Sequence, residues 1–387
     1  MKCTIVKEQI IEGLQKSAAV IPTKTGTGYL RTLWLNAEGD SISVMTTDAN
    51  IEFTGKYAAK VSQSGFVGIQ GQLFVDLVRR LGPGEFDMEL DNESGNLLVR
   101  QGRKKFTLPV SNPEWFSKQF SEFPTEGAVV WSGDFLQDIL ERVLFCVADE
   151  GASSLEAISC LYMKPVGNGR IDICGLNGVR FAMVSLTHDD LHALLPEQGL
   201  MVQKNYMIYL RKWLGSDEIE LNITNKRLFL RTQNGSEMIS LPRSTYDYPD
   251  YTTFLSRISG DEVHTLTLNK KEALDALGRI LLFSTESERC TYFDLTANEL
   301  VMSAQGKDSG SAQENLEISY DGDVPRIAFP TKGMSEMLEH FNSETLQLHI
   351  SSVDGPCGIT GKDDPDYTSI IMPLKVVETS YYTESEA

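Results

Sequence analysis

The sequence lacks the features that mark membrane-spanning and secreted proteins. No apolar run reaches the roughly 18 residues that a bilayer-spanning helix needs. The N-terminal stretch MKCTIVKEQIIEGL carries charges where a signal peptide is continuously apolar. The six cysteines are scattered and form no CxxC pair, a usage typical of reduced, mostly buried thiols. We therefore expect a soluble, cytoplasmic protein with no membrane partner.

Motifs of catalysis are missing or weak. The glycine-rich stretch at 24–28 fits neither GxxxxGK[ST] nor GxGxxG and is interpreted as a surface loop. There is no GxSxG elbow. His188 and His192, four residues apart with two aspartates between them, could hold a metal. Thr187 followed by those aspartates is equally a helix N-cap. We expect no enzyme, no cofactor and no metal, and keep a metal-dependent hydrolase at the two histidines as an alternative.

A basic balance is also missing, because the 387 residues carry a net charge of −19. Proteins that bind nucleic acid by simple electrostatic attraction are usually basic. A role with nucleic acid would therefore need positive charge gathered on one surface.

The sequence does contain a long repeat. Leu108-Pro109, Leu241-Pro242 and Met372-Pro373 are spaced by 133 and 131 residues. Each pair ends a helix signal followed by three runs of alternating apolar and polar residues, clearest between 201 and 251. A strand, a helix and further strands precede each of these units, with helices that begin at 7, 133 and 270. The repeat predicts six half-units, each a helix with antiparallel strands.

We therefore predict an α+β chain of three similar domains. The expected boundaries are 1–127, 128–259 and 260–376, followed by an acidic, disordered tail at 377–387. Ser132 and Asn269 are expected to cap their helices. The apolar spacing predicts inward faces made of Ile10, Ile11, Leu14 and Ala18 in the first front helix, Phe135, Ile139, Leu140 and Val143 in the second, and Leu274, Leu277 and Leu281 in the third.

Charge is distributed unevenly between the six predicted helices and the rest of the chain. The helices at 7–20, 71–82, 133–148, 204–214, 270–283 and 332–341 together carry +2, which leaves −21 elsewhere. A concave surface lined by such helices could hold a polyanion through phosphate contacts that read no bases.

The order of the local motifs resembles one family. These motifs are MKCTIVKEQIIEGLQ at the start, SVMTTDANIE at 43–52, GLNGVR at 175–180, YPDY at 248–251 and IIMPLKV near the end. With the three repeats, the acidic balance and the less acidic helices, they resemble the bacterial DNA polymerase III beta subunit, the beta sliding clamp, over residues 1–376.

The resemblance implies a homodimer closed head to tail into a ring, with helices inside and sheets outside. Such a ring encircles double-stranded DNA and tethers a polymerase, so its function is topological and not catalytic. Implied partners are the DNA polymerase catalytic subunit, the clamp-loader complex and other proteins with clamp-binding motifs. The residues expected to face DNA are Lys24, Arg79, Arg80, Lys204, Arg211, Lys212, Lys270 and Lys271.

The resemblance also implies a partner-peptide cleft between the second and third domains. By position it comprises Ile158, Leu176, Gly178, Arg180, Phe181, Pro249, Phe254, Ile370, Met372, Pro373, Leu374 and Val376. Several of these could instead be core of the domain boundary. Asn177, Val179, Thr253 and Lys375 depart from the family pattern and leave the preferred peptide open.

For the dimer interface, the resemblance implies Arg103, Lys105, Phe106 and Leu108 on one edge, with Lys104 beside them. Leu282 and Phe283 lie across the seam, with acids such as Glu314. Phe106 and Leu108 could equally be ordinary strand interior. The alternative for the whole chain is a three-domain scaffold that binds peptides without encircling DNA.

Overall fold

The computed structural model describes residues 1–23, 27–91, 93–116, 120–260, 262–283, 290–306 and 309–375. Lys24, Val376 and the predicted tail 377–387 lie outside these residues. The chain divides into two compact units, Met1–Leu140 with Asp189–Thr245, and Glu141–His188 with Tyr246–Ala387. Neither unit matches a single repeat, and the boundaries of the three domains stay a prediction.

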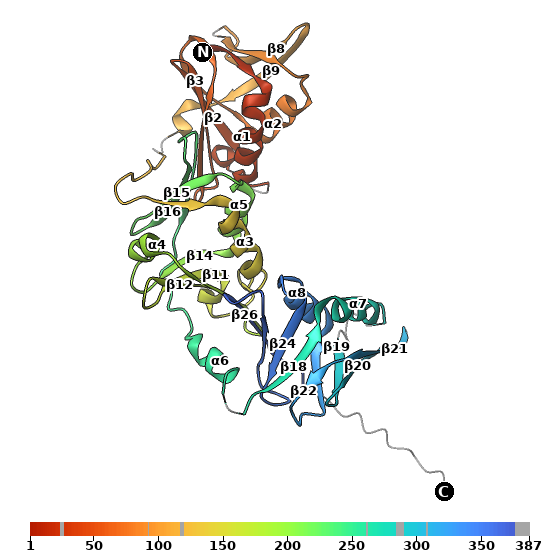
Figure 1. Ribbon diagram of the computed structural model, residues 1–387. Helices are drawn as coiled ribbons and strands as arrows, with labels where there is room; N and C mark the ends of the chain where they lie inside the picture. The colour runs from red at the N-terminus through yellow and green to blue at the C-terminus, as the bar shows by residue number, and fades with distance from the viewer. Residues whose placement is uncertain are drawn as a thin grey trace. The chain divides into compact units, whose positions relative to one another are not determined.

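Antiparallel strands make up the sheet of the first unit (Figure 1), in the order β10-β15-β16-β17-β4-β3-β2-β6-β9-β8-β7-β1-β5. Residues along its strands alternate between the two faces, so that Ile42 and Val44 are fully buried and their neighbours are not. The strands are β1 Lys2–Val6, β2 Thr32–Glu38, β3 Ser41–Thr47, β4 Glu52–Ala58, β5 Lys60–Gln63, β6 Gly65–Gln70, β7 Glu85–Asp91, β8 Asn96–Gln101, β9 Lys104–Ser111, β10 Val129–Ser132, β15 Glu218–Ile223, β16 Arg227–Thr232 and β17 Glu237–Pro242. This unit also holds β14 Leu200–Gln203 and the short helix α4 Asp189–Leu194.

Two sheets form the second unit. One runs β11-β12-β13-β26-β25-β24-β18-β22 and the other β21-β20-β19-β23. Their strands are β11 Cys160–Pro165, β12 Arg170–Leu176, β13 Arg180–Thr187, β18 His264–Asn269, β19 Cys290–Leu295, β20 Glu299–Gly306, β21 Gly310–Glu317, β22 Ser319–Tyr320, β23 Arg326–Pro330, β24 Thr345–Ile350, β25 Cys357–Gly361 and β26 Tyr367–Ile371. A short helix, α6 Thr252–Arg257, precedes β18.

The six predicted helices are confirmed, each within a few residues of its expected ends. They are α1 Lys7–Val20, α2 Gly71–Arg80, α3 Gly133–Leu144, α5 Lys204–Trp213, α7 Lys270–Leu281 and α8 Thr331–Glu339. None of the described helices is long and apolar enough to cross a membrane. The element order contains six half-units, each a strand, a helix and three strands, as the repeat predicts.

Two residues of the expected inward faces are wrong. In α3, Phe135 is 44% exposed and the adjacent Leu136 is buried; in α7, Leu281 is 37% exposed and Ile280 is buried. In both helices two adjacent apolar residues lie at the edge of the apolar stripe. The helical period alone does not show which of the two is buried. The predicted cap at Asn269 is confirmed, since its side chain accepts from the Glu272 amide at 3.1 Å. None of the six cysteines forms a disulfide, and five of them are buried.

One backbone hydrogen bond recurs in the three repeats. The first residue of the front helix donates its amide to a carbonyl just after the back helix: Lys7 to Gly84, Gly133 to Asp217 and Lys270 to Glu344, at 3.1, 3.1 and 2.8 Å. This bond ties the two helices of each repeat together within its own unit. It gives the sequence repeat a direct structural counterpart.

Two lysines strengthen this tie. Lys7 Nζ donates to the carbonyls of Arg79 and Leu81, and Lys270 Nζ donates to the carbonyl of Phe341 at 2.7 Å. Carbonyls at the C-terminal end of a helix have no partner within the helix, and a cation also compensates the negative end of the helix dipole. The lysine therefore caps the back helix of its repeat.

Replacing Lys270 by Met should lower the free energy of unfolding by about 1.5–3 kcal/mol, the usual contribution of a hydrogen bond to a charged group. The matched control is Lys271→Met, because Lys271 is the exposed neighbour and should change stability by less than about 0.5 kcal/mol. Urea unfolding followed by circular dichroism compares the two. Equal effects would contradict the capping role.

Candidate functional site

The same strand pairing joins successive repeats in both units. In the first unit β4 pairs with β17, with Ser240 opposite Glu52 and Ile239 opposite Phe53. In the second unit β13 pairs with β26, with Phe181 opposite Ile370. Each pairing joins the last strand of one front half-unit to the last strand of the following repeat. We call these two pairings the first and second junction.

β21 and β9 occupy the same positions in their repeats as the strands that form the junctions. Each has an edge that, over most or all of its length, pairs with no other strand among the described residues. β21 ends the front half of the third repeat and lies at the end of its sheet, beside β20 only. β9 ends the first repeat; its residues Lys104–Pro109 pair with β8, while only Val110 and Ser111 reach β6. The chain thus has one unused strand edge of each junction type. Unpaired edges tend to recruit another strand.

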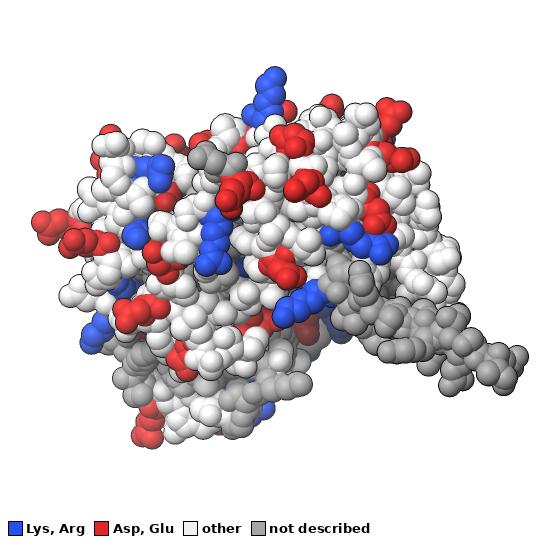
Figure 2. All heavy atoms as spheres, turned by 90° about the horizontal axis from the view of Figure 1, so that it is seen from below, with Lys and Arg blue, Asp and Glu red and all other residues white. Residues whose placement is uncertain are grey.

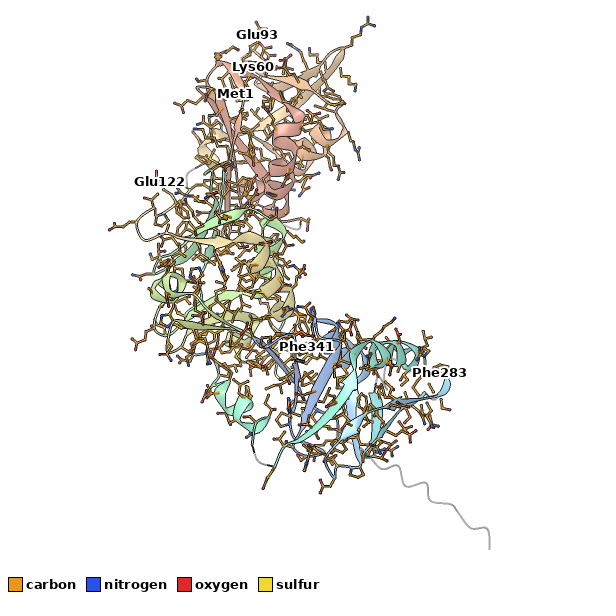
Figure 3. All side chains as sticks on the ribbon, viewed as in Figure 1. Met1, Lys60, Glu93, Glu122, Phe283 and Phe341 are labelled. Carbon is orange, nitrogen blue, oxygen red and sulfur yellow. The ribbon has the colours of Figure 1, made fainter. Side chains whose placement is uncertain are left out.

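The predicted interface residues lie at or near these edges, with different exposures. Leu108 is buried in the core of the first unit and Phe106 packs partly against that core, whereas Arg103 and Lys105 are exposed. Leu282 is 78% exposed, the highest value among the large apolar side chains described. Figure 3 shows Phe283 beside the end of β21, where Ser309 Oγ donates to its carbonyl at 2.6 Å. Leu108 is therefore accounted for by packing within its own unit, whereas the exposed Leu282 is not.

The acid expected opposite the basic edge already has a partner. Glu314 in β21 accepts two hydrogen bonds from Arg279 of α7, at 2.7 and 2.9 Å. Hydrogen bonds from Arg279, and to a smaller extent its charge, lower the pKa of Glu314. Its carboxylate therefore stays ionised and is partly compensated within the same chain.

Basic residues of the helices differ in how free they are. Arg79, Arg80, Lys212 and Lys271 are exposed, and Arg79 also pairs with Asp76 at 2.9 Å. The half-buried residues of the predicted set are Lys204, Arg211 and Lys270, and the Lys270 ammonium is engaged as a helix cap. Figure 2 shows acidic and basic side chains interspersed on the face seen there. Among the described basic residues of these helices, exposed cations thus occur beside cations that already have partners.

The predicted cleft residues that the structure describes all lie in the second unit and fall into two groups. Four are buried, namely Ile158, Leu176, Phe181 and Ile370. The others are at least partly accessible, namely Gly178, Arg180, Pro249, Phe254, Met372, Pro373 and Leu374. The buried group therefore matches the alternative interpretation, in which these residues belong to a core. We call the accessible group, with the 56% exposed Val179, the docking surface.

An aromatic cluster lies under the docking surface. The Phe181 ring stacks on Tyr251 with centroids 5.9 Å apart and meets Phe254 edge-on at 6.3 Å. Tyr251 is buried, and its hydroxyl donates to Asp172 at 2.8 Å. Burial, followed by the nearby Cys174 and Asp172, raises the pKa of Tyr251 far above its ordinary value, so the hydroxyl stays a donor. The roles of Tyr251 and Asp172 were not predicted, although Tyr251 lies in the YPDY motif.

Arg180 is not a free cation. Its guanidinium pairs with Glu336 of α8 and lies 5.7 Å from the centroid of the Phe145 ring. Lys332 approaches the same carboxylate at 3.8 Å. No sequence signal connected Glu336 to Arg180, because the two residues are 156 positions apart. The basic rim expected at Arg180 is therefore largely compensated.

The two junctions differ in the polarity of the paired side chains. Phe53 and Ile239 line a small cavity of about 20 Å³ with α1 and α5, so Glu52 and Ser240, one residue on, face the other side of the sheet. Glu52 is 2% exposed and accepts from the Ser121 amide at 3.0 Å, with Arg227 at 4.0 Å. The first junction thus contains a buried, partnered charge, whereas the second contains the apolar pair Phe181 and Ile370, against which Tyr251 stacks.

The alternative metal site gains no support. The described part of the chain contains no group of three or more His, Cys, Asp and Glu residues that could hold a metal ion.

Comparison with known proteins agrees with this geometry. A family model described as DNA polymerase III beta subunit, N-terminal domain, matches residues 1–119, and one described as its C-terminal domain matches residues 259–375. The chain belongs to the DNA polymerase III beta subunit family. The predicted function is confirmed at this level: the protein is a DNA sliding clamp, a processivity factor and not an enzyme.

Relatives of this family member are distant but match over their full length. The beta sliding clamp of Caulobacter vibrioides is 20% identical, over 97% of this chain and 100% of its own. That of Chlamydia muridarum is 23% identical, over 97% and 99%. The sliding clamp structure from Bacillus subtilis has a TM-score of 0.87 at 18% identity, over 97% and 100% of the two chains. A Pseudomonas aeruginosa clamp structure, bound to griselimycin, has a TM-score of 0.86 at 21% identity, over the same shares. The clamp fold is thus retained at low identity.

Proposed function

We propose that two copies of this clamp close head to tail into a ring around double-stranded DNA. The observation that carries the proposal is the pair of unused strand edges. At both junctions within the chain, a strand that ends a front half-unit pairs with the last strand of the next repeat. β21 and β9 are the two strands of this kind left over, one at each end of the repeat series. Pairing β21 of one copy with β9 of the next is a heterologous contact, which closes when the rotation permits.

Side chains at the two ends suit the same contact. Counted from Lys7 and Lys270, which make equivalent hydrogen bonds, Leu282 and Phe283 correspond to Ala19 and Val20. In α1 those two residues line the cavity shared with α5 at the first junction. Leu282 and Phe283 would cover the corresponding position between copies, with Phe106 and Leu108 from β9 and the cations Arg103, Lys104 and Lys105 at the rim. Burying the exposed Leu282 adds an apolar contribution of about 1.5–3 kcal/mol.

The helices are proposed to face the DNA, and the contacts are proposed to be few and exchangeable. The candidates are Lys24, Arg79, Arg80, Lys204, Arg211, Lys212, Lys270 and Lys271, and the exposed ones among them are the strongest. A closed ring stays on DNA by topology, so a chain of net charge −19 needs no tight grip. Contacts to phosphates alone carry no sequence information, as sliding requires.

The docking surface of the second unit is proposed to bind a short peptide segment of a polymerase or of another replication protein. Its accessible members are apolar, apart from Arg180, and Met372 can adapt its shape to different side chains. A peptide carrying Leu or Phe would fill such a surface, since buried anchors supply most of the affinity at interfaces. In the sequence, Val376 and the segment after it directly follow Leu374 and Lys375. The proposed partners are the DNA polymerase catalytic subunit, the clamp-loader complex and other proteins with such a motif, in the cytoplasm.

Retention on DNA tests the ring. The clamp is loaded on nicked circular DNA by a clamp loader and ATP, and free protein is removed by gel filtration. Cutting the circle should release the clamp within minutes, because a ring runs off the ends, while the uncut circle should keep it. Equal retention on cut and uncut DNA would favour the scaffold that binds without encircling.

The interface is tested by Leu282→Glu, which places a charge at the proposed seam. Sedimentation equilibrium should give twice the chain mass of 43.1 kDa for the unchanged protein and a single chain mass for the variant. The control is Leu155→Glu, at a leucine that is 46% exposed and far from both edges in sequence. A Leu282→Glu protein that keeps the mass of the unchanged protein would contradict the seam.

A further inference from the structure

Asp172 is an ionisable side chain inside the sheet of the second unit. It lies in β12 between Ile171 and Ile173 and is 2% exposed. One carboxylate oxygen accepts from Ser185 Oγ at 2.7 Å, with Arg170 Nε at 3.4 Å, and the other accepts from the Tyr251 hydroxyl at 2.8 Å. A buried carboxylate is costly unless its oxygens are satisfied. This one therefore holds Tyr251 in a fixed position.

Tyr251 connects the buried Phe181 to Phe254 of the docking surface. Its ring stacks on Phe181, and its carbonyl accepts from the amides of Phe254 and Leu255, at 3.0 and 3.2 Å, where α6 begins. Lys164 Nζ lies 5.6 Å from the ring centroid. The position of Tyr251 thus sets where Phe254 lies against Phe181.

Tyr248, the first residue of the YPDY motif, makes a stacking contact. The Tyr248 ring stacks on Tyr162 with centroids 4.3 Å apart. The Tyr248 hydroxyl is buried and has no hydrogen-bond partner among the described residues. Of the two tyrosines of the YPDY motif, only Tyr251 has its hydroxyl bonded to the sheet among the described residues.

We propose that the Tyr251–Asp172 hydrogen bond is a positioning device that preforms the docking surface. The bond keeps Phe254 against Phe181, so a peptide binds without first ordering this part of the surface. Neither Tyr251 nor Asp172 needs to touch the peptide, because both are buried beneath it. A surface that is ordered before binding gives higher affinity, since less freedom is lost on association. This inference rests on the proposed peptide-binding function.

The test is fluorescence anisotropy with a fluorescein-labelled decapeptide that ends in Leu-Phe, titrated with the full-length clamp. A second peptide with both residues replaced by alanine reports non-specific binding. Tyr251→Phe keeps the ring and removes the hydrogen bond, and should raise the Kd about tenfold, the affinity equivalent of one ordinary hydrogen bond. Tyr248→Phe is the matched control and should leave the Kd within about twofold, because its hydroxyl has no partner.

A milder variant covers the case in which Tyr251→Phe fails to fold. Ser185→Ala removes the other hydroxyl that orients Asp172, and should raise the Kd by about threefold. Circular dichroism and sedimentation establish that each variant is folded and keeps the unchanged assembly state.

The outcomes separate the two proposals. If the unchanged clamp does not distinguish the Leu-Phe peptide from its alanine form, the docking surface itself is wrong. If it does, but Tyr251→Phe and Ser185→Ala bind as tightly as the unchanged clamp, the positioning role is overturned and the docking surface stands. A Tyr248→Phe loss as large as that of Tyr251→Phe also overturns the positioning role.

Discussion

Antiparallel strand pairing across the junction between repeats is the interaction on which the rest of this structure depends. It joins β4 to β17 in one unit and β13 to β26 in the other. Backbone hydrogen bonds make few demands on side-chain identity, which is consistent with a clamp fold retained at about one-fifth identity to its relatives. The same pairing leaves β21 and β9 with open edges. Because these open edges are of the kind that pair within the chain, the proposed association with a second copy would repeat the same interaction.

What differs between the junctions gives them different uses. At the first, the carboxylate of Glu52 is buried and has three neighbours. It accepts hydrogen bonds from the Ser121 amide and the Ser240 hydroxyl, and Arg227 lies 4.0 Å away. At the second, Phe181 lies opposite Ile370 and stacks on Tyr251. The same type of strand pairing thus holds a buried charge in one unit and underlies the proposed docking surface in the other.

Much of the fold could be predicted from the sequence, because it follows from local signals that the repeat presents three times. Helix positions, the Asn269 cap and the strand–helix–three-strand order all follow from such signals. Neighbouring apolar residues were harder: Phe135 and Leu281 lie at the border of their stripes, and tertiary packing decides which side is buried. The partners of Lys270, Arg180 and Asp172 lie 71, 156 and 79 residues away. No local pattern encodes contacts at that separation, so family resemblance indicated the surface but not what orients it.

The most direct test of the central claim is hydrogen exchange of the backbone amides in β9 and β21 at high and low protein concentration. If copies join through these edges, the amides of 104–107 and 310–317 that point away from β8 and β20 should be protected at high concentration. They should lose protection together on dilution, while β8 and β20 stay protected. A stable dimer whose β9 and β21 edges exchange rapidly at every concentration would contradict the account.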